Sequence, residues 1–360
     1  MAGVAGSSQR GVSMGESDMA SLLAELDASG MAGLTRSFAD DLEAAMAAEV
    51  GIEDDSDWSG VLCLGMGGSG AGGRFLKALA DAEGGLPFVV WGDYGLPSWW
   101  GPEWLVLATS YSGNTEETLD GVREALESGG TVVGVCSGGQ LAELLDGSDD
   151  SVSLAVPGGQ MPRSAFGHIL GTQLAACWAL GLLAAPSGDE RAAMVERLRA
   201  AAADADLIDG DGMSETMARS IAGREVGIVA PTELGPAAYR FACQLNENSA
   251  AFAHPAEVPE MNHNEIVAWS AEDTSSRGLI AFTSDSTRSR ARARMGWMLD
   301  NIETEIVWRI ECEGSSLLER LLYAAHVTDW VSIALALLNG RDPSEMAAID
   351  SLKVHLASIQ

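Results

Sequence analysis

The sequence predicts an α/β protein with two doubly wound parallel sheets, followed by a C-terminal helix. Five short apolar runs alternate with helical segments between residues 61 and 156, a pattern typical of a doubly wound parallel sheet. The same order of strand, turn and helix begins again at Val226. A chain of 360 residues, 47% of them hydrophobic, is long enough to bury two cores. We therefore expect two α/β lobes.

The first lobe is predicted from its apolar runs. Residues 17–49 show helical periodicity and predict one or two helices before the first strand. The predicted strands are residues 61–64, 87–91, 104–108, 131–136 and 151–156. The predicted helices between them are residues 74–81, 115–127 and 141–145. Residues 165–186 are apolar enough to query as a membrane span, but the polar side chains of His168, Thr172 and Gln173 favour a buried helix.

The second lobe shows a similar but less regular pattern. An acidic, alanine-rich helix at residues 189–206 leads into it. Its predicted strands are residues 226–230, 278–283 and 304–308, and its helices are residues 237–246, 317–339 and 344–359. These elements predict four parts: an N-terminal extension with helices (1–50), a first domain (51–190), a second domain (191–343) and a C-terminal helix (344–360).

The charge of the chain limits its partners. With 52 acidic and 21 basic residues the formal net charge is −31, which disfavours nucleic acid and anionic membranes as partners. Only two of the basic residues are lysines. This composition suits either a protein in concentrated salt or an ordinary acidic protein of the cytosol. Any basic residue at an anion site therefore acts against the field of the whole protein.

The five cysteines are scattered and form no Cys-x-x-Cys or Cys/His metal spacing. Their number is odd, and three of them lie within apolar runs. Such cysteines are typical of proteins in a reducing compartment. Residues 1–20 lack the apolar segment of a secretory signal. We therefore expect a cytoplasmic protein without a metal centre.

A polar turn follows the predicted strand at 104–108. Residues 109–118 read Thr-Ser-Tyr-Ser-Gly-Asn-Thr-Glu-Glu-Thr and gather three hydroxyl groups where a strand ends and a helix begins: Ser110, Ser112 and Thr115. Asn114, with Glu117 three residues later, resembles a capping box. Free N–H groups and the helix dipole favour an anion there, and neutral donors suit the phosphate monoester of a small molecule. The alternative is an ordinary capped helix.

A glycine-rich segment, Gly65-Met-Gly-Gly-Ser-Gly-Ala-Gly-Gly73, follows the first predicted strand. Its G-x-G-x-x-G spacing, with Asp93 after the next strand, is also typical of dinucleotide sites, so a nicotinamide-dependent oxidoreductase is an alternative function. Two features disfavour it. The loop holds more glycine than that fingerprint needs, with Ser69 at its apex, and the hydroxyl-rich turn would have no role in a dinucleotide fold. A tight structural turn is the third interpretation.

Four further residues are candidates for proton-transfer chemistry. Arg163 precedes an apolar helix and must find an anion, either a structural acid or a developing oxyanion. Glu247, flanked by asparagines, is either a held general base or a solvated helix-end acid. His263 lies between Asn262 and Asn264, which could fix its tautomer, or it has no role. Lys353, in the predicted C-terminal helix, is one of only two lysines and is either kept for a function or an ordinary solvated helix lysine.

In this order, the motifs resemble the bifunctional phosphoglucose/phosphomannose isomerase family, which is built from two sugar-isomerase (SIS) domains. The resemblance spans about residues 50–360, and the Ser-Tyr-Ser-Gly-Asn-Thr and Asn-His-Asn-Glu segments are its most specific parts. Six segments carry it: Gly65-Met-Gly-Gly-Ser-Gly70, Ser110-Tyr-Ser-Gly-Asn-Thr115, Pro162-Arg163, Asn246-Glu247-Asn248, Asn262-His-Asn-Glu265 and Leu352-Lys353.

The resemblance implies an isomerase of carbohydrate metabolism, acting in glycolysis and gluconeogenesis. It implies interconversion of glucose 6-phosphate, and of mannose 6-phosphate, with fructose 6-phosphate through a cis-enediolate, without a cofactor or metal. It further implies a homodimer whose histidine reaches into the partner's site. A regulator that binds a sugar phosphate without catalysis is a further alternative, because SIS domains often serve regulators.

The resemblance also implies a role for each site residue. Ser69, Ser110, Ser112 and Thr115 would hold the sugar phosphate, with Gly67, Gly68 and Gly113 shaping the supporting loops. Arg163 would stabilise the enediolate and Glu247 would transfer the proton. His263 and Lys353 would open the sugar ring.

Overall fold

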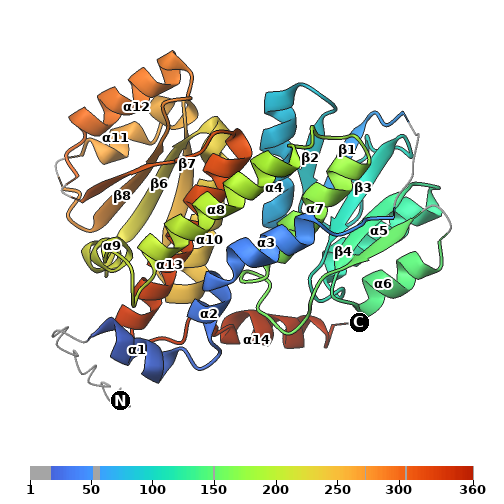
Figure 1. Ribbon diagram of the computed structural model, residues 1–360, viewed down its shortest axis with the longest axis horizontal. Helices are drawn as coiled ribbons and strands as arrows, with labels where there is room; N and C mark the ends of the chain where they lie inside the picture. The colour runs from blue at the N-terminus through green and yellow to red at the C-terminus, as the bar shows by residue number, and fades with distance from the viewer. Residues whose placement is uncertain (1–17, 52–56, 149–150, 272, 305, 360) are drawn as a thin grey trace, which may run out of the picture.

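The computed structural model describes residues 18–51, 57–148, 151–271, 273–304 and 306–359. Two parallel sheets stand side by side, each covered by helices on both faces (Figure 1). The predicted fold class is confirmed. A layer of helices lies between the two sheets and joins the lobes into one body.

The first sheet has the strand order β2-β1-β3-β4-β5, with all strands parallel. Its strands are β1 (Gly60–Leu64), β2 (Phe88–Trp91), β3 (Trp104–Thr109), β4 (Val132–Cys136) and β5 (Val152–Ala155). Its helices are α4 (Gly67–Glu83), α5 (Glu116–Glu127), α6 (Gly139–Asp146) and α7 (Phe166–Ala179). All five strands agree with the sequence prediction to within one residue at either end, and the three central ones, β1, β3 and β4, are the buried apolar runs expected of a parallel sheet.

The second sheet has the order β7-β6-β8-β9, again all parallel, and so repeats the order of the first four strands. Its strands are β6 (Glu225–Pro231), β7 (Ala253–Val258), β8 (Arg277–Thr283) and β9 (Val307–Glu311). Its helices are α9 (Met213–Ile221), α10 (Gly235–Ser249), α11 (Ile266–Trp269) and α12 (Ser289–Asn301), with single turns η1 (Thr232–Leu234) and η2 (Glu260–His263).

The remaining helices cover and connect the lobes. They are α1 (Met19–Leu26), α2 (Met31–Arg36), α3 (Phe38–Met46), α8 (Gly188–Ala205), α13 (Leu317–Leu338) and α14 (Ala347–Leu356). Among the described residues α13 is the one helix long and apolar enough to cross a membrane, but 89% of its apolar window is buried in the fold, as in a core helix. The apolar helix predicted after Phe166 is α7, and it is buried as expected.

Several predicted boundaries are wrong. The strand predicted at 304–308 is β9, which begins three residues later, and β7, α9 and α12 were not predicted. Both β7 and β9 are edge strands in which buried and exposed residues are mixed, so they lack the continuous apolar run of a central strand. Pro255 lies within β7, where an edge strand tolerates proline.

The helix predicted at 74–81 begins much earlier, because the glycine-rich segment itself forms the first turns of α4. A Cβ atom on Gly70 would lie 2.3 Å from the carbonyl oxygen of Gly65, and one on Gly73 would lie 2.8 Å from Cβ of Cys63. The glycines therefore let α4 pack directly against its own strand. The N-cap of α5 is Thr115 instead of Asn114, without a side-chain cap, so no capping box forms.

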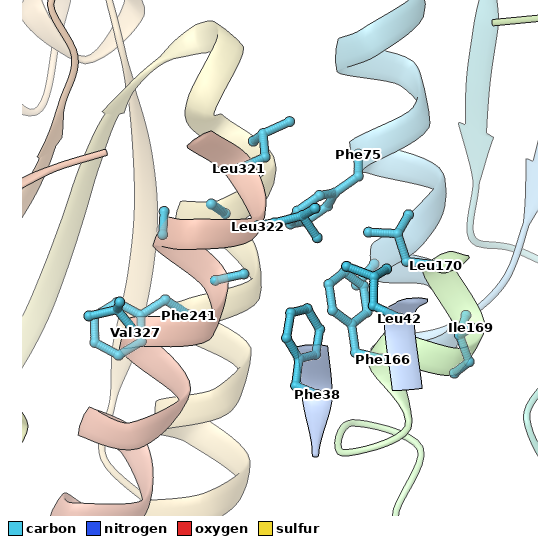
Figure 2. Close-up of a cluster of buried hydrophobic side chains, with 14 of the residues drawn as sticks. Phe38, Leu42, Phe75, Phe166, Ile169, Leu170, Phe241, Leu321, Leu322 and Val327 are labelled. Atoms are coloured by element: carbon cyan, nitrogen blue, oxygen red, sulfur yellow. The ribbon is translucent and has the colours of Figure 1, made fainter. Parts of the chain in front are cut away.

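One hydrophobic core extends across both lobes. Figure 2 shows its centre, where aromatic and aliphatic side chains of α3, α4, α7, α10 and α13 meet. Phe38 of α3 stacks on Phe166 of α7, and Phe75 of α4 packs edge-on against the same ring. Because the inner helices of the two sheets share this core, residues far apart in sequence are held at fixed positions between the lobes.

The turn after β3 depends on a glycine, which gives a prediction about stability. Gly113 has φ +67°, and a Cβ atom there would lie 1.7 Å from the carbonyl oxygen of Gly138. We expect Gly113→Ala to lower the free energy of unfolding by about 3 kcal/mol or more, combining left-handed strain with the clash. Urea denaturation measures the change.

Gly129→Ala is the matched control, because Gly129 has φ +77° but open space around it. That substitution should cost only about 1–2 kcal/mol. Equal losses in the two variants would contradict the close approach of the two loops.

Candidate active site

Two neighbouring segments, the first turn of α4 and the turn after β3, form the hydroxyl-lined end of the site. Ser69, in the first turn of α4, accepts a hydrogen bond from the backbone N–H of Tyr111 at 3.0 Å. Ser110 and Thr115 lie 2.8 Å apart through their side-chain oxygens. The first turn of α4 has no acidic residue, so its N–H groups can face an anion. The predicted hydroxyl cluster is therefore assembled at the carboxyl ends of β1 and β3.

Ser112 lies at the exposed tip of the same loop. Its hydroxyl accepts the N–H of Asn114 at 3.3 Å, and the Asn114 side chain returns a hydrogen bond to the Ser112 carbonyl at 2.8 Å. Gly113 closes this tight turn. The loop is thus ordered by its own polar groups, with the Ser112 side chain open to solvent.

Arg163 is the central cation of the site, with a side chain only 1% exposed. Its Nε donates to Oδ1 of Asn248 at 2.6 Å and its Nη2 donates to the Pro343 carbonyl at 2.7 Å. A Cβ atom on Gly68 would lie 3.0 Å from the backbone nitrogen of Arg163, so Gly68 permits the close approach of α4. The backbone of Arg163 is thereby held against the first turn of α4, next to Ser69, while its guanidinium group is held by the second lobe.

Glu247 completes this arrangement from the end of α10. Its Oε2 lies 3.4 Å from Nη1 of Arg163, and its side chain is 24% exposed. Burial raises the pKa of the Glu247 carboxyl, although Arg163 and Arg240 act in the opposite direction. A carboxylate with a raised pKa next to a fixed cation is suited to proton transfer near neutral pH.

The asparagines beside Glu247 act differently from the sequence prediction. The Asn246 side chain holds the backbone of Ala253, with hydrogen bonds of 2.9 and 3.0 Å. The Asn248 amide joins Arg163 to Ser332. In the described part of the chain neither amide contacts the carboxylate, so Arg163 is what positions Glu247.

A buried polar network that the sequence analysis missed lies behind Arg163. Arg240 of α10 donates to Asp329 of α13 at 2.6 Å and to the carbonyl of Arg163 at 3.1 Å. Gln244 also donates to Asp329, at 2.9 Å. The available signal was an aspartate inside the apolar run of α13, because a buried charge requires a partner.

The two remaining candidates lie apart from this cluster. His263 is exposed at the end of η2, and Lys353 is exposed on α14. The neighbours of His263 were predicted to fix its tautomer, but their amides contact Met261 and Met298 (Asn262) and Glu260 (Asn264). Within the described residues no interaction joins either candidate to Glu247 or Arg163.

Two other acids have local roles. Glu265 is bound by the ring nitrogen of His254 at 2.9 Å and by the indole N–H of Trp269 at 2.8 Å. The hydrogen bond to Glu265 raises the pKa of His254. Asp93, the acid of the dinucleotide alternative, accepts the N–H of Tyr94 at 2.8 Å. Of the acids singled out in the sequence analysis, Glu247 is the one that contacts Arg163.

Comparison with known proteins shows which family the chain is similar to. A profile described as the bacterial phospho-glucose isomerase C-terminal SIS domain matches residues 211–356. The chain is 33% identical over 303 residues to the bifunctional phosphoglucose/phosphomannose isomerase of Thermoplasma acidophilum, covering 83% of this chain and 90% of that protein. It is 31% identical to the corresponding protein of Aquifex aeolicus, over 84% of this chain and 92% of that one.

Solved structures share the fold at lower identity. Tagatose-6-phosphate ketose/aldose isomerase from Escherichia coli superposes with a TM-score of 0.65 at 17% identity, over 91% of this chain and 95% of that one. A hypothetical protein from Thermus thermophilus gives a TM-score of 0.71 at 16% identity, over 94% of this chain and 93% of that one. At these identities the likeness concerns the fold alone.

The network behind Arg163 gives a prediction about stability. Asp329→Asn removes the charge that compensates Arg240, whose side chain is only 2% exposed. Leaving that cation uncompensated should lower the free energy of unfolding by about 3–5 kcal/mol, measured by urea denaturation.

Asp300→Asn is the matched control, because Asp300 pairs with Arg309 where both side chains are more than half exposed. It should cost at most about 1 kcal/mol. A loss as small as this in Asp329→Asn would contradict the compensating role of Asp329.

Proposed function

Because the chain belongs to the bifunctional phosphoglucose/phosphomannose isomerase family and is a sugar-phosphate aldose–ketose isomerase, we propose that it interconverts glucose 6-phosphate and mannose 6-phosphate with fructose 6-phosphate. The reaction would pass through a cis-enediolate. The observation that carries the proposal is the contact between the Glu247 carboxylate and the buried guanidinium of Arg163, whose backbone packs on Gly68 beside Ser69.

The hydroxyl cluster would bind the phosphate of the substrate. Ser69, Ser110, Ser112 and Thr115 supply neutral donors, and the N-terminal turn of α4 supplies N–H groups. Gly68 and Gly113 would support the site by letting its loops pack against Arg163 and Gly138, and Gly67 has open space beside it. Binding energy gained there orients the reacting carbons without changing during the chemical step.

Glu247 would act as the base. It takes the proton from C2 of the open-chain aldose, which leaves an enediolate, and returns the proton to C1 to give the ketose. The negative charge that develops on the enediolate oxygens is stabilised by the fixed guanidinium of Arg163. Because C2 of the enediolate is planar, reprotonation at C2 from one face gives glucose 6-phosphate and from the other gives mannose 6-phosphate. No external electron donor takes part, since the hydrogen moves within the substrate.

Ring opening requires an acid and a base at the ring oxygen and the anomeric hydroxyl. We assign these tasks to His263 and Lys353, and the site to a homodimer in which His263 serves the partner subunit. Two features support this assignment. Both side chains are exposed, and α14, which carries Lys353, has no buried residue. Its apolar Leu352 and Val354 are 56% and 74% exposed, a surface that a second subunit would cover.

The experiment that tests the proposal supplies fructose 6-phosphate and measures both aldose products in separate coupled assays. We expect the wild-type protein to form glucose 6-phosphate and mannose 6-phosphate. Glu247→Gln should lower both rates by at least about 10²–10⁴-fold, because positioned proton transfer contributes that much. Its affinity for fructose 6-phosphate should remain.

Glu247→Gln also tests the electrostatics of the site. Burial raises the pKa of this carboxyl, so its ionisation costs stability as the pH rises from the ordinary value of 4.5 through the raised value. In Glu247→Gln that cost is absent and Arg163 keeps Asn248 and the Pro343 carbonyl as acceptors, so the variant should be at least as stable as wild type at pH 7. Retained turnover in a folded Glu247→Gln protein would end the assignment of the base.

Subunit complementation tests the shared site. Neither His263→Ala nor Glu247→Gln should be active alone, but an equal mixture refolded together should recover about a quarter of wild-type activity. Half of the dimers are then mixed, and each mixed dimer has one site with both groups intact. Differently tagged subunits verify that mixed dimers form. Mixed dimers without activity would contradict a histidine donated across the interface.

A further inference from the structure

A second, basic cleft lies between the facing edges of the two sheets, away from the proposed active site. It has a volume of about 1150 Å³ and is lined by residues of β2 and α4 from the first lobe and of β7, α10, α12 and α13 from the second. Six of the chain's 21 basic residues line it, against three of its 52 acidic residues. The six are Arg74, Lys77, Arg288, Arg290, Arg294 and Arg320.

The arginines of α12 and of its N-cap are not used for ion pairs within the described part of the chain. Arg288, Arg290 and Arg294 take part in none among the described residues, although acidic groups are abundant elsewhere on the protein. Arg290 and Arg294 are four residues apart and therefore share a face of the helix. On the opposite wall, the Arg74 guanidinium lies 3.9 Å above the Tyr239 ring. Gathering cations against the overall charge costs electrostatic repulsion, which a bound anion would relieve.

The cleft includes part of the segment in the second lobe that corresponds to the hydroxyl-rich turn of the first lobe. By sheet order β6 corresponds to β1 and β8 to β3. The segment after β8, Ser284-Asp-Ser-Thr287, is rich in hydroxyl groups like the segment after β3. Ser284 and Ser286 lie 2.9 Å apart through their side-chain oxygens, and Ser286 lines the cleft. The Thr287 hydroxyl is already bound to Glu233 at 2.7 Å, so here arginines supply most of the donors.

We propose that this cleft binds a small phosphorylated metabolite with two anionic groups, one held by the α4 wall and one by the α12 wall. A guanidinium group can donate two parallel hydrogen bonds to two oxygens of one phosphate group. The uncharged hydroxyl groups of residues 110–115 in the first lobe cannot form such charged, two-point contacts. Both α4 and α10 extend from this cleft to the active site: α4 begins at Gly67 and passes Arg74, and α10 ends beside Glu247. Occupancy of the cleft is therefore coupled to catalysis through two shared helices.

The test is calorimetric titration of the full-length protein with inorganic pyrophosphate at physiological ionic strength, where non-specific attraction is screened. We expect pyrophosphate to saturate one site per chain in the wild type. The same binding should persist in Ser110→Ala, which alters the hydroxyl cluster of the first lobe. In Arg290→Ala/Arg294→Ala the affinity should fall about tenfold or more for each arginine removed. Binding by that double variant as tight as wild type would overturn the proposal.

Arg309→Ala is the matched control, because Arg309 belongs to the same lobe and carries the same charge, but pairs with Asp300 at the surface and does not line the cleft. Its affinity should change less than about threefold. An equal loss in Arg309→Ala, or no saturable binding to the wild type, would also overturn the proposal. Because the readout is binding, its failure is distinct from failure of the isomerase assignment. A change of isomerase rate with pyrophosphate in wild type, absent in the double variant, measures the coupling.

Discussion

The buried guanidinium of Arg163 is the interaction on which the rest of the site depends. A charge with a side chain 1% exposed is stable only where fixed acceptors replace water. Those acceptors come from the end of α10 and from the segment after α13, while the backbone of Arg163 packs on Gly68. One cation therefore brings the second lobe and the glycine turn of the first lobe to a single point.

The electrostatics around that point are arranged in two layers. The inner layer is the pair of Glu247 and Arg163. The pKa of Glu247 stays raised because the effect of burial outweighs that of Arg163 and Arg240. Asp329 neutralises Arg240 in the layer behind, which leaves Arg163 as the principal cation facing Glu247. Without Asp329, two adjacent buried cations would repel one another, and both would favour an ionised, less basic Glu247. The outer layer thus maintains the basicity that the inner one uses.

Much of this arrangement was predictable from sequence because it depends on local patterns. Central strands are continuous apolar runs, and the residues 110–115 and Glu247 lie where a strand or helix ends, so their positions follow from element boundaries. Edge strand β7 and the helical start of α4 were not predictable in this way. The first has a mixed pattern, and the second contradicts glycine's low helix propensity because close packing on β1 overrides it. Asp329 was missed because its partner is 89 residues away.

The repeated sheet order makes the difference between the two lobes informative. Each lobe follows its third strand in chain order, β3 or β8, with a hydroxyl-rich segment, yet only the second segment leads into an arginine-rich helix. A phosphate that must be released after each turnover is better held by neutral donors, since strong charge-assisted bonds slow dissociation. A ligand that reports on conditions instead benefits from tight binding. The same fold can therefore support rapid release of a substrate at the first sheet and tight binding of a second ligand at the other. The arginines are concentrated in the second lobe, where tight binding is proposed.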